Sequence, residues 1–173
     1  MILPDSPSFA PALTALRDMR AEGNIASLSE ACPGLALHSD AGLTISGHWQ
    51  SPAGRLLELD VAIDGHGDWL GLHVALGLDD LTALDWVGLT CRVAAPAEIM
   101  IRPCLRSGQT DGFTDSFFPR HILAVAEPRN HVDTLHIPTS RAIPETAPWR
   151  ELVLFLPRES FSLHLQDLKI FAV

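Results

Sequence analysis

The sequence feature that most constrains the fold is a strict alternation of aliphatic residues in GDWLGLHVALGL, residues 67–78. Every even position from 70 onward is large and apolar: Leu70, Leu72, Val74, Leu76 and Leu78. Successive side chains of a β-strand point to opposite faces, so a period of two predicts a strand with one face in a hydrophobic core. The opposite face carries a tryptophan, a histidine and small residues: Trp69, Gly71, His73, Ala75 and Gly77.

The same alternation recurs through most of the chain after residue 24. Residues 43–49, 55–64, 86–94 and 98–107 each read as a strand, with weaker strands at 121–125 and 132–138, and glycine and proline punctuate the intervals. Residues 151–173 read as the clearest hairpin, with residues 158–160 as its turn. A change of phase at Gln166-Asp167 predicts a β-bulge there. Pro103 predicts that its strand lies at a sheet edge or is bulged.

These strands predict an all-β fold, a two-sheet jelly-roll-type β-sandwich, rather than a parallel α/β fold. Residues 8–23 carry Leu13, Leu16 and Met19 at helical spacing before Gly23, which predicts an N-terminal amphipathic helix. Residues 78–86 read as a short helix that bridges two strands. We therefore expect an N-terminal helical segment, 1–24, packed on a single β-sandwich domain, 25–173.

Composition and charge exclude several classes of partner. The formal net charge of −9 argues against nucleic acid and anionic membranes, because clustered Lys and Arg side chains bind both. No long apolar run is present, and the N-terminus lacks a basic region ahead of a hydrophobic stretch. We therefore expect no membrane span, no secretory signal and a cytoplasmic location. Three widely spaced cysteines indicate reduced, packed thiols rather than disulfides or a metal knuckle.

Aligning the buried sets of the middle strands places their other residues on one common outward face. This predicted face holds Glu58, Asp60, Trp69, His73, Trp86, Arg92, Arg102, Arg106 and His164. Glycine in the interior of a strand weakens the strand, so the presence of Gly71, Gly77 and Gly88 on this face needs a structural explanation. Two explanations stay open: a ligand that lies close to the backbone of a concave sheet, or a face that is covered by residues 8–23 or simply exposed.

The segment RSGQTDGFTDSFFPRH, residues 106–121, is a second candidate feature. Asp111 and Asp115 flank a Gly-Phe pair, among Phe113, Phe117 and Phe118. Loops held by a rigid scaffold often carry function. We interpret this segment as a loop with an aromatic plug held by an Asp–Arg pair. The spacing of an EF-hand is absent, and we expect no metal or other cofactor.

Motifs of the common catalytic sites are also absent. The chain has no GxSxG, HExxH, GxxxxGK[ST] or GxGxxG, and its eight histidines form no HxH pair. No residue is assigned a catalytic role on this basis.

The C-terminal stretch WRELVLFLPRESFSLHLQDLKIFAV and the rhythm from GDWLGLHVAL to WVGLTCRVAA resemble carbohydrate-binding-module-like, galactose-binding-like β-sandwiches, over residues 43–173. The resemblance implies a non-catalytic domain that binds a glycan on a concave sheet face or on loops at one end. Many members also hold a structural calcium, for which Asp167 is the comparable position here.

The leading hypothesis is a non-catalytic domain that binds a glycan or a similar polar ligand on one sheet face. The candidate ligand-binding residues are Trp69, His73, Arg92, Arg102, Arg106, Asp111 and Asp115. Two alternatives stay open: a protein–protein interaction or assembly module that uses the same face, and a glycan-active hydrolase or lyase with Glu58, Asp60 and His73 as acid and base. The sequence leaves the oligomeric state open, a homodimer included.

Overall fold

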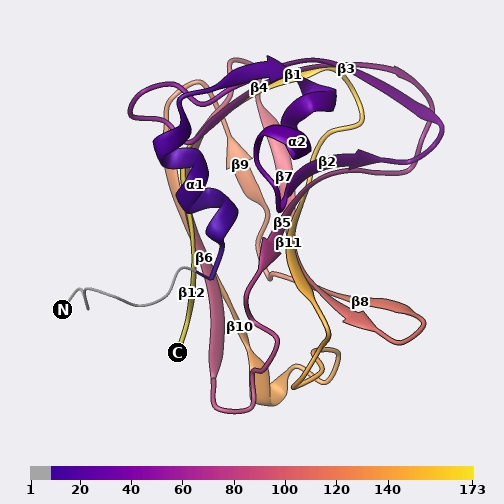
Figure 1. The fold of residues 1–173 in the computed structure, drawn as a ribbon, viewed down its shortest axis with the longest axis vertical. Coiled ribbons are helices and arrows are strands. Elements are labelled where there is room, and N and C mark those ends of the chain that lie inside the picture. Colours follow the sequence, from indigo (N-terminus) through magenta and orange to yellow (C-terminus); the bar gives the residue numbers. More distant parts are fainter. Residues whose placement is uncertain (1–8) are drawn as a thin grey trace.

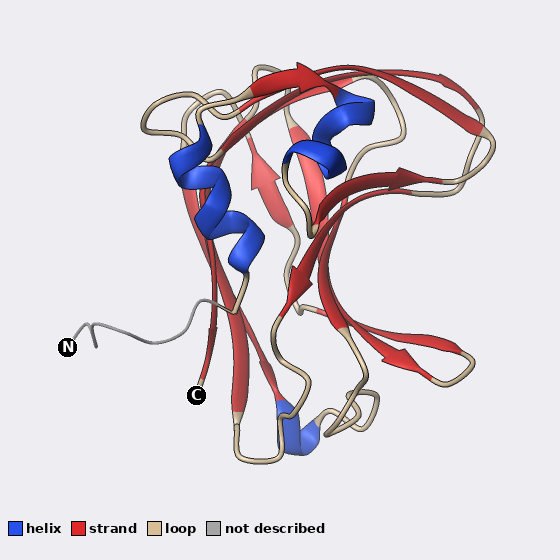
Figure 2. Ribbon diagram, in the orientation of Figure 1, coloured by secondary structure: helices blue, strands red, loops and turns tan. Residues whose placement is uncertain are grey.

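The computed structural model describes residues 9–173, which fold into two antiparallel β-sheets packed face to face (Figures 1 and 2). Sheet A has the order β1 (Glu22–Asn24), β3 (Leu43–Gln50), β4 (Leu57–Gly65), β12 (Phe161–Ala172), β6 (Trp86–Ala94) and β10 (Arg129–His136). Sheet B has the order β2 (Leu35–Ser39), β5 (Leu70–Leu76), β11 (Arg150–Phe155), β7 (Ile99–Gln109) and β8 (Gly112–Phe117), and β9 (Ile122–Ala124) also pairs with β7. The all-β sandwich predicted from the sequence is confirmed.

The hydrophobic core lies between the sheets and is built from the alternating aliphatic positions. Leu70, Leu72 and Val74 of β5 have no exposed surface, and Leu152 and Leu154 of the neighbouring β11 are equally buried. Burial of apolar surface is the dominant favourable contribution to folding. The inner faces therefore fix which side of each strand points outward.

The N-terminal helix α1 (Pro11–Met19) packs at one side of the sandwich. Its Ala12, Leu13 and Leu16 join the core between the sheets. The backbone N–H of Gly77 donates to the carbonyl of Phe9 at 2.9 Å. Arg17 Nη2 donates to Asp167 Oδ1 at 2.9 Å and to the carbonyl of Leu168 at 2.5 Å. The helix therefore joins the end of β5 to β12, and the explanation that it covers the outer face of β5 is wrong.

The remaining short elements connect these parts. They are the 3-10 turn Ile25–Ser27, α2 (Leu28–Ala31) and the 3-10 turn Ile137–Thr139. Of the predicted N-terminal segment, 1–24, residues 1–8 lie outside the described residues, and Glu22–Asn24 form an edge strand of sheet A. Within residues 9–173, no helix has the length and apolar character needed to cross a membrane. The three cysteines are buried and free.

Two predicted connections are wrong. Residues 78–85 form no helix but an irregular segment with a bridge from Asp80 to Thr146 and a turn at Leu81–Leu84, and Trp86 begins β6. Residues 151–173 form no hairpin, because β11 pairs with β5 and β7 in sheet B while β12 pairs with β4 and β6 in sheet A. The bulge predicted near Gln166-Asp167 is confirmed by a register shift between Leu165 and Asp167.

Two further details of sheet B differ from the sequence prediction. Residues 106–117 form most of the β7–β8 hairpin rather than a loop. Pro103 lies in β7, which has neighbouring strands on both sides. On one side β7 pairs with β11, and on the other residues 99–101 pair with β9 and residues 104–109 pair with β8. The partner strand of β7 thus changes at the residue that lacks an N–H group.

Arg150, at the start of β11, holds two loops against sheet B. Its side chain is buried, with 1% exposure, and it donates to Ser107 Oγ at 3.1 Å and to the carbonyls of Leu78 and Pro144. Buried carbonyls that lose a charged donor keep the cost of their lost hydration. This guanidinium therefore links both the 77–85 and the 140–149 connections to sheet B.

Arg150→Met is expected to lower the free energy of unfolding by about 2–4 kcal/mol, because it leaves the Leu78 and Pro144 carbonyls without their donor. Urea denaturation measures this. The exposed Arg141, changed to Met, is the matched control and is expected to stay within about 0.5 kcal/mol of the wild type. Equal stability of the two variants would contradict this role for Arg150.

Arg17→Met is expected to lower the free energy of unfolding more at neutral pH than in acid. Burial raises the pKa of Asp167, but hydrogen bonding and charge from Arg17 and Lys169 outweigh burial, so the pKa lies below its ordinary value. A carboxyl with a depressed folded pKa stabilises the fold above its unfolded pKa of about 3.9, and this stabilisation is lost as pH falls through the folded pKa. Unfolding measured from pH 7 to pH 3 should show the difference between variant and wild type shrinking below about pH 4.

Candidate functional site

The outer face of sheet B is concave and carries two adjoining hollows. Figure 1 shows β2 and the β7–β8 hairpin projecting to the same side, beyond β5 and β11. The first hollow, of about 580 Å³, is lined by His38, Trp69, His73, Arg106, Phe113, Asp115, Trp149, Glu151 and Phe155. The second, of about 470 Å³, is lined by Asp68, Trp69, Leu70, Arg102, Phe117, Phe155, Leu156, Pro157, Arg158 and Glu159. Trp69 and Phe155 belong to both, and we call the two hollows together the groove.

A row of charged side chains crosses the first hollow from strand to strand. Asp115 of β8 is in register with Arg106 of β7, which is in register with Glu151 of β11. Directly opposed residues of antiparallel strands lie about 5 Å apart, so their side chains meet. The row therefore runs across the floor of the groove.

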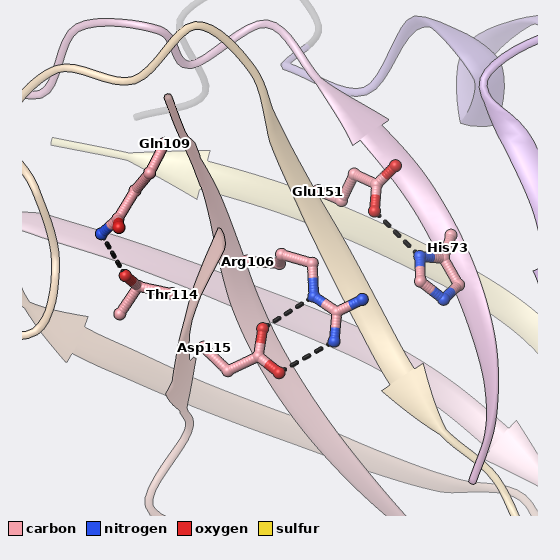
Figure 3. A network of polar contacts seen from close by, with 6 residues as sticks. All are labelled: His73, Arg106, Gln109, Thr114, Asp115 and Glu151. Carbon is pink, nitrogen blue, oxygen red and sulfur yellow. Dashed lines mark hydrogen bonds and ion pairs between the residues drawn. The ribbon is translucent and has the colours of Figure 1, made fainter. Parts of the chain in front are cut away.

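Arg106 is held rigidly at the centre of this row. Its Nε donates to Asp115 Oδ1 at 2.7 Å and its Nη2 to Asp115 Oδ2 at 2.8 Å, and the guanidinium carbon lies 3.8 Å from the centroid of the Phe113 ring. The hydrogen bonds to Asp115 raise the pKa of Arg106. Figure 3 shows the remaining nitrogen, Nη1, pointing away from Asp115 toward the side where Glu151 and His73 lie. Nη1 makes no hydrogen bond within residues 9–173 and is a free donor.

Glu151 is oriented by His73. The histidine Nδ1 lies 2.8 Å from Glu151 Oε2 (Figure 3). A carboxylate only accepts hydrogen bonds, so Nδ1 carries the proton. The hydrogen bond from His73 lowers the pKa of Glu151 against the effect of burial, and the charges of Arg106 and His38 act in the same direction. Among the described residues, Oε1 has no hydrogen bond and remains a free acceptor.

Aromatic rings border this polar row. Trp149, 39% exposed, lies over Gly108, where a Cβ atom would be 2.4 Å from the indole nitrogen. The Phe117 and Phe155 ring centroids are 5.8 Å apart, and the Arg102 guanidinium lies 3.5 Å above the Phe117 centroid. The groove thus combines flat apolar rings with paired donors and acceptors.

Two of the three strand glycines make room for side chains of neighbouring residues rather than for a ligand or for the helix. A Cβ atom on Gly71 would lie 3.1 Å from His73 Nε2 and 3.0 Å from Val153 Cγ1. On Gly88 it would lie 2.1 Å from the Phe171 ring, whereas Gly77 has open space around it. Gly71 therefore lets the His73 ring lie against the strand.

Five of the seven predicted site residues line the groove: Trp69, His73, Arg102, Arg106 and Asp115. Arg92 does not share their face. It lies on β6 in sheet A, where it donates to Gln166 at 2.9 Å and to Asn130 at 3.2 Å, because alternation within a strand does not reveal which sheet the strand joins. Asp111 is exposed in the turn of the β7–β8 hairpin and lines neither hollow.

The acid and base set of the hydrolase alternative is not brought together. Glu58 and Asp60 lie on β4 of sheet A, whereas His73 lies on sheet B. Glu58 is bonded to Arg55 and Gln50, and Asp60 accepts from Ser162 at 2.5 Å.

Sequence reasoning missed Glu151, Phe155, Trp149 and His38 as groove residues. The first two could have been found, because Glu151 and Phe155 alternate with Leu152 and Leu154, whose burial sends the odd positions outward. The segment LALHS around His38 carries too few apolar positions to show its outward face.

The residues around Asp167 do not fit a structural calcium. Its two carboxylate oxygens face Arg17, at 2.9 Å, and Lys169, at 3.4 Å. Residues 9–173 contain no group of three or more His, Cys, Asp or Glu side chains placed to hold a metal ion.

Several solved structures of similar fold are carbohydrate-binding modules. A CBM4 structure matches with a TM-score of 0.61 and 11% identity, covering 92% of this chain and 98% of its own. The N-terminal cellulose-binding domain of β-1,4-glucanase C from Cellulomonas fimi matches with a TM-score of 0.56 and 14% identity, covering 81% and 89%. The family 11 module from Clostridium thermocellum, solved with a β-1,3-1,4-mixed-linked tetrasaccharide, matches with a TM-score of 0.53 and 13% identity, covering 80% and 89%.

The chain has the fold of the carbohydrate-binding-module β-sandwiches. The resemblance inferred from its strand pattern is confirmed at the level of structure. No protein-family model matches the chain, and no curated protein matches it in sequence. The likeness to these structures, at 11–14% identity, therefore lies in the fold.

Gly108→Ala is expected to displace the Trp149 indole from the groove wall, because the added Cβ atom would overlap the ring. The indole N–H resonance of Trp149 should shift in a ¹H–¹⁵N spectrum. Gly77→Ala is the matched control, since nothing lies within 4 Å of its added Cβ atom, and it should leave that resonance in place. An unmoved Trp149 signal in the Gly108 variant would contradict the packing described.

Proposed function

We propose that this protein binds a carbohydrate chain, without catalysis, in the groove of sheet B. The observation that carries the proposal is the row formed by Asp115, Arg106 and Glu151, bordered by aromatic rings on a concave sheet. The shared fold with carbohydrate-binding modules supports the class of ligand.

The groove matches the two surfaces of a sugar ring. A sugar presents apolar C–H faces, which pack on flat aromatic side chains such as Trp69 and Trp149. It also presents hydroxyl groups, each of which donates one hydrogen bond and accepts others. A ligand hydroxyl can accept from Arg106 Nη1 or donate to Glu151 Oε1, and hydrogen bonds to charged groups are the stronger ones.

The polar row is preorganised for this contact. Asp115 fixes the guanidinium of Arg106, and His73 fixes the carboxylate of Glu151. Groups that are already ordered lose little conformational freedom on binding, which favours affinity. The contacts available are therefore suited to a polar, uncharged hydroxyl-rich ligand.

The two hollows suit a chain of sugars rather than a single one. They meet at Trp69 and Phe155, so a ligand can pass from the Arg106–Glu151 row to the Arg102–Phe117 pair. The first ligands to test are the mixed-linked tetrasaccharide of the Clostridium thermocellum module and the cellulose of the Cellulomonas fimi domain.

Isothermal titration with mixed-linked β-glucan and cello-oligosaccharides, preceded by a broad glycan array, tests the proposal. Trp69→Ala and Arg106→Ala are each expected to weaken binding at least about tenfold, since both lie at the centre of the contact surface. Trp86→Ala and Arg92→Ala, which change the same residue types on sheet A, should bind as the wild type does.

Circular dichroism and thermal unfolding should show that all four variants keep the fold. Binding that survives in both groove variants and is lost in Trp86→Ala would place the site on sheet A and contradict the proposal. Absence of binding by the wild type across the array would remove its basis.

A further inference from the structure

We infer that His73 is a positioning residue for carbohydrate binding: it holds the Glu151 carboxylate so that Oε1 faces the ligand. This inference rests on the proposed function. It assigns a role to a side chain that lines the first hollow but is only 7% exposed, so that little of its surface can contact a ligand directly.

The geometry ties His73 to Glu151 and leaves the ring little freedom. Nδ1 lies 2.8 Å from Glu151 Oε2. The ring lies against the backbone at Gly71, with the His38 ring edge-on at a centroid distance of 4.9 Å and the Trp69 ring at 6.3 Å. A donor held in this way fixes the direction of the carboxylate that accepts from it.

The second ring nitrogen shows that packing alone does not explain a histidine here. Nε2 is buried and has no hydrogen-bond partner among residues 9–173. A buried polar atom without a partner costs free energy that an apolar side chain of similar size would not. The position therefore carries a stability cost, and within the described part of the chain the His73 side chain hydrogen-bonds to Glu151 alone.

The charged groups that face this pair come from three other strands. They are His38 of β2, Arg106 of β7 and, through Arg106, Asp115 of β8. The hydrogen bond from His73 is the largest cause of the lowered pKa of Glu151, ahead of the charges of Arg106 and His38. Loss of the His73 donor should therefore move that pKa upward even with Arg106 and His38 in place.

The pair His73→Asn and His73→Ala separates positioning from packing. Asparagine keeps an N–H donor near the place of Nδ1 and removes the buried Nε2, whereas alanine removes both. We expect His73→Ala to weaken glycan binding about tenfold and His73→Asn to stay within about threefold of the wild type. The Glu151 carboxyl carbon, followed by NMR titration without ligand, should titrate at higher pH in the alanine variant only.

A double-mutant cycle tests whether His73 acts through Glu151. In a Glu151→Ala background, His73→Ala should change affinity by less than about twofold, because the carboxylate that it positions is gone. His48→Ala, an exposed histidine on sheet A, is the control and should bind as the wild type does.

The outcomes distinguish this inference from the proposed function. A wild type that binds no glycan overturns both. A wild type that binds, together with a His73→Ala variant of equal affinity, overturns the inference alone. It is also overturned if the asparagine and alanine variants lose affinity equally while the Glu151 pKa stays unchanged.

Discussion

The groove depends on burial of the inner face of sheet B. Leu70, Leu72 and Val74 of β5 and Leu152 and Leu154 of β11 are removed from water, and this burial fixes the direction of every side chain between them. Because the side-chain period of a strand is two, a shift of one residue in register would turn the outward set inward. The core therefore stabilises the sandwich and also decides which residues the concave face presents.

On that face, each charged side chain at the centre has its own partner before any ligand arrives. Arg106 is fixed by Asp115 and Glu151 by His73, while Arg106 Nη1 and Glu151 Oε1 keep free hydrogen-bonding capacity within the described residues. Removing a charged group from water costs free energy unless an opposite charge or hydrogen bonds compensate for it. The pairing therefore allows these charged side chains to lie among aromatic rings. The same pairing leaves a donor on β7 and an acceptor on the neighbouring β11 uncommitted, and a hydroxyl group can bond to either kind of group.

The sequence predicts well which side chains of a strand point inward and which point outward, but it predicts poorly which strands pair with one another. Alternation predicts the outward direction of Trp69, His73 and Arg106, and an Asp–Arg pair is expected within residues 106–121 without its members being specified. The structure shows that the pair is Arg106–Asp115. Arg92 was misplaced because β6 alternates just as β5 does but belongs to sheet A. Strands β11 and β12 look like a hairpin because three residues separate two apolar runs, yet that short connection passes between the sheets. Which strands pair is set by long-range packing, which a local pattern does not contain.

The four tryptophans offer the most direct measurement of the central claim, that carbohydrate binds on the concave face of sheet B. Trp69 and Trp149 line the groove, Trp86 lies on sheet A and Trp49 is fully buried. In ¹H–¹⁵N spectra recorded during titration with a bound oligosaccharide, the indole signals of Trp69 and Trp149 are expected to shift while those of Trp86 and Trp49 stay in place. A titration that moves the Trp86 signal and leaves the two groove signals unchanged would rule out binding on the concave face of sheet B.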